Sequence, residues 1–139
     1  MNKKDQILKK INNNTTGTLL KSLGIKITDI NKNCVKGKMP VDHRTKQPFG
    51  ILHGGASVAL AETLGSIGGG LHINYKTHNI VGIEINASHL NAIKKGWVYG
   101  EARAIRIGKK LHVWEIFIHN KEKKIICKSR LTLAVIRKK

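Results

Sequence analysis

Residues 54–71 read GGASVALAETLGSIGGGL and form the longest helix-like segment of the chain, which has 139 residues. Together with residues 50–53 they contain seven of the chain's 14 glycines. A glycine inside a helix costs up to about 1 kcal/mol relative to alanine, so this many glycines need a physical reason. Small side chains allow a sheet to curl tightly around a helix. The segment therefore predicts a central helix that is wrapped by a sheet.

The sequence on either side of this segment predicts mostly strands. Alternating apolar residues indicate two strands within residues 25–41 and four longer ones at about 79–91, 96–107, 110–119 and 124–136. Residues 3–11 and 16–23 predict two short helices. We expect an α+β fold in which the strands follow one another as a meander and one antiparallel sheet buries one helix. The open face and edges of such a sheet favour self-association.

The length and composition fit a single domain over residues 1–139, with residues 1–15 as a basic helical extension at the N-terminus. There is no run of 18 apolar residues and no apolar stretch close behind Met1. We therefore expect a cytoplasmic protein without a membrane span or a secretory signal. Cys34 and Cys127 stand 93 positions apart, outside any Cys-x-x-Cys motif or Cys/His cluster, so we expect neither a disulfide framework nor a metal site.

The charge balance is strongly basic, with 26 Lys and Arg against eight Asp and Glu and a formal net charge of +18. Such an excess is typical of proteins that bind nucleic acid or another polyanion. The cations are spread along the whole chain, however, and there are only six aromatic residues for base stacking. We do not favour nucleic acid. A general compositional bias and an anionic small ligand stay open, and a phosphate-rich ligand would need only a few of the lysines.

The start of the predicted helix has the features of an anion site. Gly54 and Gly55 leave N–H groups bare at a helix N-terminus, which carries roughly half a positive charge. Glu62 lies two turns further along, on a face of small or apolar residues, where an unpaired carboxylate is rarely tolerated. A solvated position or a salt bridge to one of the many lysines is the alternative to a catalytic role for Glu62.

Three other polar residues lie near this helix start, and each has an ordinary structural explanation when taken alone. His53 would be a helix cap or a packed ring, Gln47 a loop residue, and Ser66 a hydroxyl that bonds back to its own helix. Their convergence on one helix end is the stronger argument for a site.

A longer block of sequence around these residues is recognisable. Residues 39–50 read MPVDHRTKQPFG and lead into LHGGAS at 52–57 and then Ala61–Glu62. At this spacing the block resembles the hotdog-fold acyl-CoA thioesterases, within them the branch of 1,4-dihydroxy-2-naphthoyl-CoA hydrolase and the proofreading thioesterase of enterobactin synthesis. Residues 81–89 (VGIEINASH) and 129–132 (SRLT) are similar to that branch too, so the resemblance covers roughly residues 20–136.

The resemblance implies a hotdog fold, an antiparallel sheet wrapped around one long central helix, and a dimer that usually forms a tetramer. It places the active site at the dimer interface. The implied catalytic residues are Glu62, His53, Gly55, Gln47 and Ser66. The implied CoA contacts are Gly82, Ser88, His89, Leu90, Asn91, Ala92, Arg106, Ile107, Gly108, Lys109 and Lys110. Asn91 stands where relatives can carry Arg, and Lys94, Lys95, Lys109 or Lys110 would then supply the phosphate contact.

We therefore expect an enzyme that hydrolyses a CoA thioester, of an aromatic acyl group such as 1,4-dihydroxy-2-naphthoyl-CoA in menaquinone biosynthesis, without a cofactor beyond the CoA of the substrate. The Gly55 N–H would bind the thioester oxygen, with Gln47 helping to orient it. Glu62 would attack the carbonyl carbon or deprotonate a water held with Ser66, and His53 would orient the thioester or assist the departing thiol. Two alternatives are a proofreading thioesterase for aryl groups misloaded on an acyl carrier protein and a polyanion-binding module.

Overall fold

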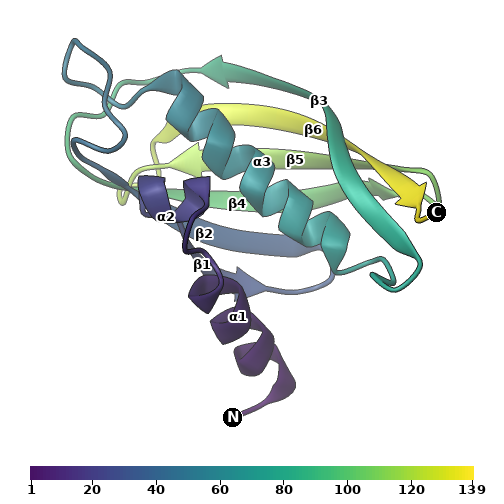
Figure 1. The fold of residues 1–139 in the computed structure, drawn as a ribbon. Helices are drawn as coiled ribbons and strands as arrows, with labels where there is room; N and C mark the ends of the chain where they lie inside the picture. Colours follow the sequence, from purple (N-terminus) through teal and green to yellow (C-terminus); the bar gives the residue numbers. More distant parts are fainter.

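The computed structural model describes residues 1–139 as one six-stranded sheet that carries a long helix (Figure 1). The helices are α1 (Lys3–Asn13), α2 (Leu19–Leu23) and α3 (Gly54–Gly70). The strands are β1 (Lys26–Ile30), β2 (Cys34–Val41), β3 (His78–His89), β4 (Gly96–Ile107), β5 (Leu111–His119) and β6 (Ile125–Arg137). The α+β class and each expected strand are confirmed to within a few residues, whereas α2 starts at residue 19 and not 16. None of the helices combines the length and the apolar character needed to cross a lipid bilayer.

The strand order in the sheet is β1-β2-β4-β5-β6-β3, and all neighbours are antiparallel. The expected meander is therefore wrong at β3. After β2 the chain passes through α3 to the far edge, where β3 pairs with β6, and only then returns to place β4 beside β2. Because the sheet curls around α3, which packs against β2 to β6, the chain that leaves α3 reaches the distant edge directly (Figure 1).

The glycines of α3 explain how closely the sheet can approach the helix. A Cβ atom at Gly68 would lie 2.5 Å from the Trp114 ring, and one at Gly65 would lie 2.6 Å from the Leu131 side chain. Trp114 and Leu131 have no exposed surface. Larger residues at these positions would push the sheet away, so the predicted role of the glycines is confirmed.

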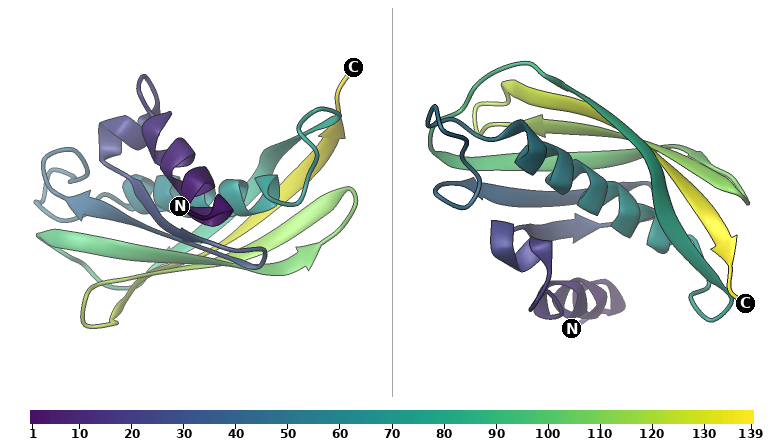
Figure 2. Two further views of the ribbon diagram at one scale, coloured as in Figure 1. Left: turned by 90° about the horizontal axis from the view of Figure 1, so that it is seen from below. Right: turned by 45° about the horizontal axis from the view of Figure 1, so that its top comes forward.

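The N-terminal helix α1 covers the edge strand β1, on the same side of the sheet as α3 (Figure 2). Its apolar residues Ile7, Leu8 and Ile11 are half-buried against the core. The side chain of Asn12 donates from Nδ2 to the Ile27 carbonyl at 2.8 Å and accepts from the Ile27 N–H at 2.9 Å. This side chain thus binds β1 in the way that a neighbouring strand would.

Candidate active site

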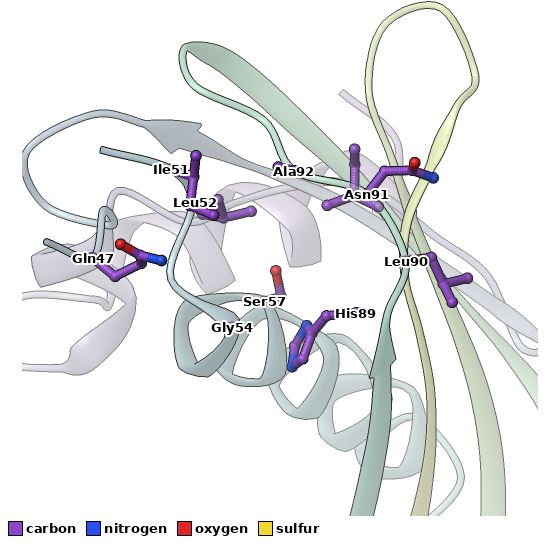
Figure 3. Close-up of a pocket in the computed structure, with 10 residues that line it drawn as sticks. Gln47, Ile51, Leu52, Gly54, Ser57, His89, Leu90, Asn91 and Ala92 are labelled. Carbon is purple, nitrogen blue, oxygen red and sulfur yellow. The ribbon is translucent and has the colours of Figure 1, made fainter. Parts of the chain in front are cut away.

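The loop between β2 and α3 holds Gln47 in a defined orientation. The backbone N–H of Gln47 donates to the Ile51 carbonyl, and the Gly50 N–H donates back to the Gln47 carbonyl, both at 2.9 Å. Gly50 has φ +82°, a conformation that favours glycine. The Gln47 side-chain oxygen accepts from the Phe49 N–H, so its NH₂ group is the end turned toward the adjoining cavity (Figure 3).

The same loop is fixed at its base by charge and hydrogen bonding. Arg44 Nη2 lies 2.7 Å from Asp42 Oδ2, and this hydrogen bond holds the pKa of Asp42 at about 2. The Thr45 hydroxyl donates to the Pro40 carbonyl at 2.7 Å, and the His53 N–H donates to the Thr45 carbonyl at 2.8 Å. The entry into α3 is therefore rigid.

The free N–H group at the start of α3 belongs to Gly54 and not to Gly55. The Gly55 N–H donates to Nδ1 of His53 at 2.7 Å, so His53 is the N-cap and the expected bare donor at Gly55 is already satisfied. The Gly54 N–H has no partner in the chain. A Cβ atom at Gly54 would lie 2.8 Å from Nε2 of His89, so only glycine allows that ring to pack against the helix start.

A cavity of about 350 Å³ opens at this helix end, between the loop and the segment that follows β3 (Figure 3). Its lining residues are Gln47, Ile51, Leu52, Gly54, Ser57, His89, Leu90, Asn91, Ala92 and Ile126. Four of the predicted CoA contacts, residues 89–92, thus line the same cavity as Gln47 and Gly54. His53 is exposed outside this lining.

Ser57 is the lining residue that the sequence analysis missed. It is 1% exposed, and its hydroxyl points into the cavity without a hydrogen-bond partner in the chain (Figure 3). Small polar residues are common in the first turn of a helix, so nothing in the sequence distinguishes Ser57 as a site residue. Asn91, by contrast, is used structurally, because its side-chain amide donates to the Ile125 carbonyl at 2.7 Å.

Glu62 lies half-buried on α3, with its carboxylate beside the edge strand β3. It makes no hydrogen bond and no ion pair, although four of the other acidic residues in the chain do form ion pairs. The alternative of a structural salt bridge is therefore wrong. One carboxylate oxygen of Glu62 approaches Gly82 of β3 so closely that a Cβ atom there would lie 2.5 Å from it.

Ser66 shares a second cavity with Glu62, of about 480 Å³. The Ser66 hydroxyl does not bond back to its helix, whereas the neighbouring Thr63 hydroxyl donates to the Ala59 carbonyl at 2.7 Å. The remaining residues around this cavity are Ile11, Asn14, Thr15, Thr18, Leu20, Thr63 and Ile67. The hydroxyl of Ser66 is thus free to hold a water or a substrate group beside the carboxylate.

Within one chain the predicted catalytic residues form two separate groups. Gln47, His53 and Gly54 lie at the start of α3, and Glu62 and Ser66 lie beside the second cavity. Gly54 and Glu62 are eight residues apart on one helix, which is about 12 Å along its axis. No carboxylate of the same chain lines the first cavity.

The remaining predicted CoA contacts are dispersed. Gly82 contacts Glu62, and Ser88 is exposed next to the first cavity. The segment of Arg106, Ile107, Gly108, Lys109 and Lys110 comprises the last two residues of β4 and the turn after it, and the 12 residues of β4 extend for about 40 Å from the end that lies near the first cavity. This turn therefore does not join the helix start in one chain. No three His, Cys, Asp or Glu side chains are placed together to hold a metal ion.

Comparison with known proteins identifies the family. Residues 49–127, more than half of the chain, match the family model that describes the thioesterase superfamily. This chain belongs to the thioesterase superfamily. Its α+β sheet with one long helix is the hotdog fold, and the protein is an enzyme that hydrolyses thioesters.

Relatives of this thioesterase align with nearly its full length. It is 50% identical to the putative esterase ComA2 of Bacillus subtilis, over 87% of this chain and 96% of that protein. It is 43% identical to the proofreading thioesterase EntH of Cronobacter turicensis, over 96% and 97%. It is 42% identical to 1,4-dihydroxy-2-naphthoyl-CoA hydrolase of Escherichia coli, over 86% and 88%.

Solved structures share the fold of this thioesterase closely. A mutant thioesterase of Pseudomonas aeruginosa superposes with a TM-score of 0.92 at 40% identity, over 94% of each chain. A protein of Staphylococcus aureus, solved as a glutamate-to-alanine mutant, superposes with a TM-score of 0.85 at 39% identity, over 86% of this chain and 99% of that one.

Proposed function

We propose that this thioesterase hydrolyses the CoA thioester of an aromatic acyl group, and that two copies of the chain build each active site. The observation that carries the proposal is the state of Glu62. It is a half-buried carboxylate, unpaired in a chain with a net charge of +18, beside the edge strand β3. A carboxylate kept free of the surrounding cations is available for chemistry.

The spacing of Gly54 and Glu62 along α3 allows a second copy of the chain to complete the site. Gly54 and Glu62 each lie four residues from Val58, which is about 6 Å along the helix. Val58 and Ala59 are small enough for another helix to approach this face closely. If two copies pack antiparallel about a two-fold axis at Val58, Glu62 of each copy lies beside Gly54 of the other.

The surfaces around the site favour this pairing. β3 is an edge strand with unpaired backbone groups, and three large apolar side chains near the two half-sites are strongly exposed: Phe49 (89%), Ile83 (57%) and Leu90 (55%). A second copy would cover them. Val81, Ile105, Leu111 and Ile136 are exposed as well, and we extend the proposal to two dimers that cover these residues in a homotetramer.

In the proposed reaction the thioester oxygen binds at the start of α3. The Gly54 N–H, at the positive end of the helix, stabilises the oxygen as it gains charge, and the Gln47 NH₂ group is the second donor. The loss of one such donor costs about 100- to 1,000-fold in turnover in well-studied enzymes. Gly55 acts indirectly, because its N–H donates to Nδ1 of His53 and this hydrogen bond fixes the turn that presents Gly54.

Glu62 of the other copy then either activates a water for attack on the carbonyl carbon or attacks that carbon itself. As a general base it takes a proton from a water held by Ser66, the water oxygen bonds to the carbonyl carbon, and the C–S bond breaks. The CoA sulfur leaves with the electron pair and takes up a proton, which exposed Nε2 of His53 can supply. As a nucleophile Glu62 instead forms a mixed anhydride that water hydrolyses. Single turnover in ¹⁸O-water separates the routes, since only the anhydride route puts label into the Glu62 carboxylate.

The CoA portion of the substrate is assigned to the first cavity, along residues 89–92. The basic turn Arg106–Lys110 lies too far away in the same chain, so its contribution to the phosphates comes from another copy. Lys94 and Lys95 come directly after the lining residues 89–92 and are exposed, so they supply the phosphate contact that an arginine at position 91 would make. Apart from the CoA of its substrate, the proposed reaction uses no cofactor.

Names and mutated positions of relatives support the proposal. The E. coli relative is named for the hydrolysis of an aromatic acyl-CoA. The two S. aureus mutant structures replace a glutamate and a glutamine that precedes it by 15 positions, and Gln47 precedes Glu62 by 15 positions in this chain. The Cronobacter relative is named a proofreading thioesterase, which keeps a second candidate substrate open: an aryl group misloaded on an acyl carrier protein, for which the basic surface would also be suitable.

The shared site can be tested by mixing two inactive variants, Glu62→Gln and Gln47→Ala. Each alone should lose at least about 100-fold in kcat/KM for benzoyl-CoA. If the site combines Glu62 of one copy with Gln47 of the other, a mixed dimer has one intact site, and random assortment restores about a quarter of the wild-type activity. Absence of any restoration after refolding the mixture refutes the shared site, and near-normal activity of Glu62→Gln alone refutes the proposed chemistry.

The acyl group and its carrier need a separate assay. We expect benzoyl and hydroxynaphthoyl thioesters of CoA to be hydrolysed faster than medium-chain aliphatic ones. The same aryl group loaded on an acyl carrier protein shows which carrier is preferred. A preference for aliphatic chains, or hydrolysis only on the carrier protein, would contradict the proposed substrate.

A further inference from the structure

The second cavity draws its walls from two parts of the chain that are distant in sequence. One wall is α3, through Glu62, Thr63, Ser66 and Ile67. The opposite wall, named here the N-terminal wall, consists of Ile11, Asn14, Thr15, Thr18 and Leu20. All five of its residues precede the region 49–127 that matches the superfamily. The cavity beside the free carboxylate is therefore bordered by a segment that lies outside the region matched to the superfamily model.

The N-terminal wall is held firmly by hydrogen bonds. Asn12 pairs with both backbone groups of Ile27, at 2.8 and 2.9 Å. At the other end of the segment the Ile25 N–H donates to the Leu20 carbonyl at 2.9 Å. Between these two anchors the Thr18 hydroxyl donates to the Thr15 carbonyl at 2.5 Å. Both ends of the wall are thus attached to β1 or the residue before it, and its distance from α3 is set by these contacts.

The orientation of the bound substrate indicates which part of it the second cavity holds. A thioester has its reacting carbon between the sulfur side and the acyl side. The first cavity of one copy, with residues 89–92, is the proposed place of the CoA side. The acyl side then extends past Glu62 of the other copy toward Ser66 and Ile67 of that copy. That path enters the second cavity.

We infer that the N-terminal wall limits the size of the acyl group, with Thr15 and Thr18 as the residues that determine selectivity and Asn12 as a positioning residue. This inference rests on the proposed role of Glu62. Thr15 and Thr18 are short side chains across the cavity from Thr63 and Ser66. Larger residues there fill the acyl space and leave the carboxylate and the helix start unchanged.

The test replaces Thr15 and, separately, Thr18 with phenylalanine and compares benzoyl-CoA with acetyl-CoA. The kcat/KM for benzoyl-CoA should fall by about tenfold or more, while that for acetyl-CoA stays within about twofold. Thr16→Phe is the matched control, because Thr16 is exposed and does not line the cavity. An unchanged benzoyl-to-acetyl ratio in both variants, with native circular dichroism, overturns the inference.

Asn12→Asp tests the positioning role. The substitution keeps the size of the side chain but removes the donor to the Ile27 carbonyl. A merely structural Asn12 would lower the melting temperature and leave the benzoyl-to-acetyl ratio at its wild-type value. We expect the ratio to change by about threefold or more as the wall shifts, with Asn13→Asp as the control. A wild-type ratio in Asn12→Asp refutes the positioning role.

The Glu62→Gln variant distinguishes a failure of this inference from a failure of the proposed function. If Glu62→Gln loses hydrolysis of both esters and the phenylalanine variants keep the wild-type selectivity, the proposed role of the N-terminal wall is refuted and the proposed function stays intact. Full activity of Glu62→Gln removes the proposed function and the inference together.

Discussion

Replacement of Gly82 by alanine should reduce catalysis without weakening the fold. A Cβ atom at Gly82 would lie 2.5 Å from a carboxylate oxygen of Glu62 and 3.7 Å from the Leu131 side chain. Only the first contact is too short. The oxygen must move by about 0.9 Å to reach an ordinary contact, and a misplacement of about 1 Å at a reacting group can cost about 100-fold in rate. That factor corresponds to about 2.7 kcal/mol of activation free energy.

Stability should not fall, because the displaced atom is the end of a flexible side chain and alanine is favoured over glycine within a strand by roughly 0.5–1 kcal/mol. The assay is steady-state hydrolysis of benzoyl-CoA together with a thermal melt. A double-mutant cycle identifies the route of the effect: in a Glu62→Gln background, Gly82→Ala should cause little further loss. An equal loss in both backgrounds, or wild-type kcat/KM in Gly82→Ala, would refute a role of Gly82 that acts through Glu62.

Three further predictions concern stability. Burial first, and then nearby His72, lower the pKa of His112 below 6.5; the unfolded chain therefore binds the proton first, and stability is lost as the pH falls below 6.5. The melting temperature should drop less for His112→Gln than for wild type between about pH 7 and pH 5, and parallel curves would contradict this. The pKa of Asp42 is lowered from 3.8 to about 2 by Arg44, so its stabilising contribution is complete above 3.8 and is lost as the pH falls toward 2. Arg44→Ala should remove that part of the acid transition, as followed by circular dichroism. In Gly68→Ala the overlap with Trp114 should cost about 1–3 kcal/mol, less a helix gain of up to about 1 kcal/mol, and an unchanged urea midpoint would exclude the overlap.

The elements of the fold were accessible from local patterns, but the position of β3 was not. Residues 79–91 alternate in the same way as the other strands, and alternation identifies a strand without naming its neighbour. The pairing of β3 with β6 depends on the curl of the sheet around α3, which is a property of the packed molecule. The glycines at 65 and 68 indicated the close packing, because their cost inside a helix requires a compensating contact.

The residues of the candidate site could largely be predicted from the sequence, but their arrangement in space could not. Glu62 was conspicuous as the one charge on an apolar helix. Which glycine offers a free N–H could not be predicted, since it depends on the His53 ring turning back onto Gly55. Thr15 and Thr18 lie in a segment without periodicity, and only the folded chain brings them opposite Ser66.

The hydrogen bonds of Asn12 also bear on how the chain assembles. They occupy both backbone groups of Ile27 on one border of the sheet, while the β3 border stays unoccupied. Pairing of a further strand with β1 is therefore blocked at Ile27. The amide of a single asparagine thus protects part of one sheet edge against the edge-to-edge pairing that leads to fibres.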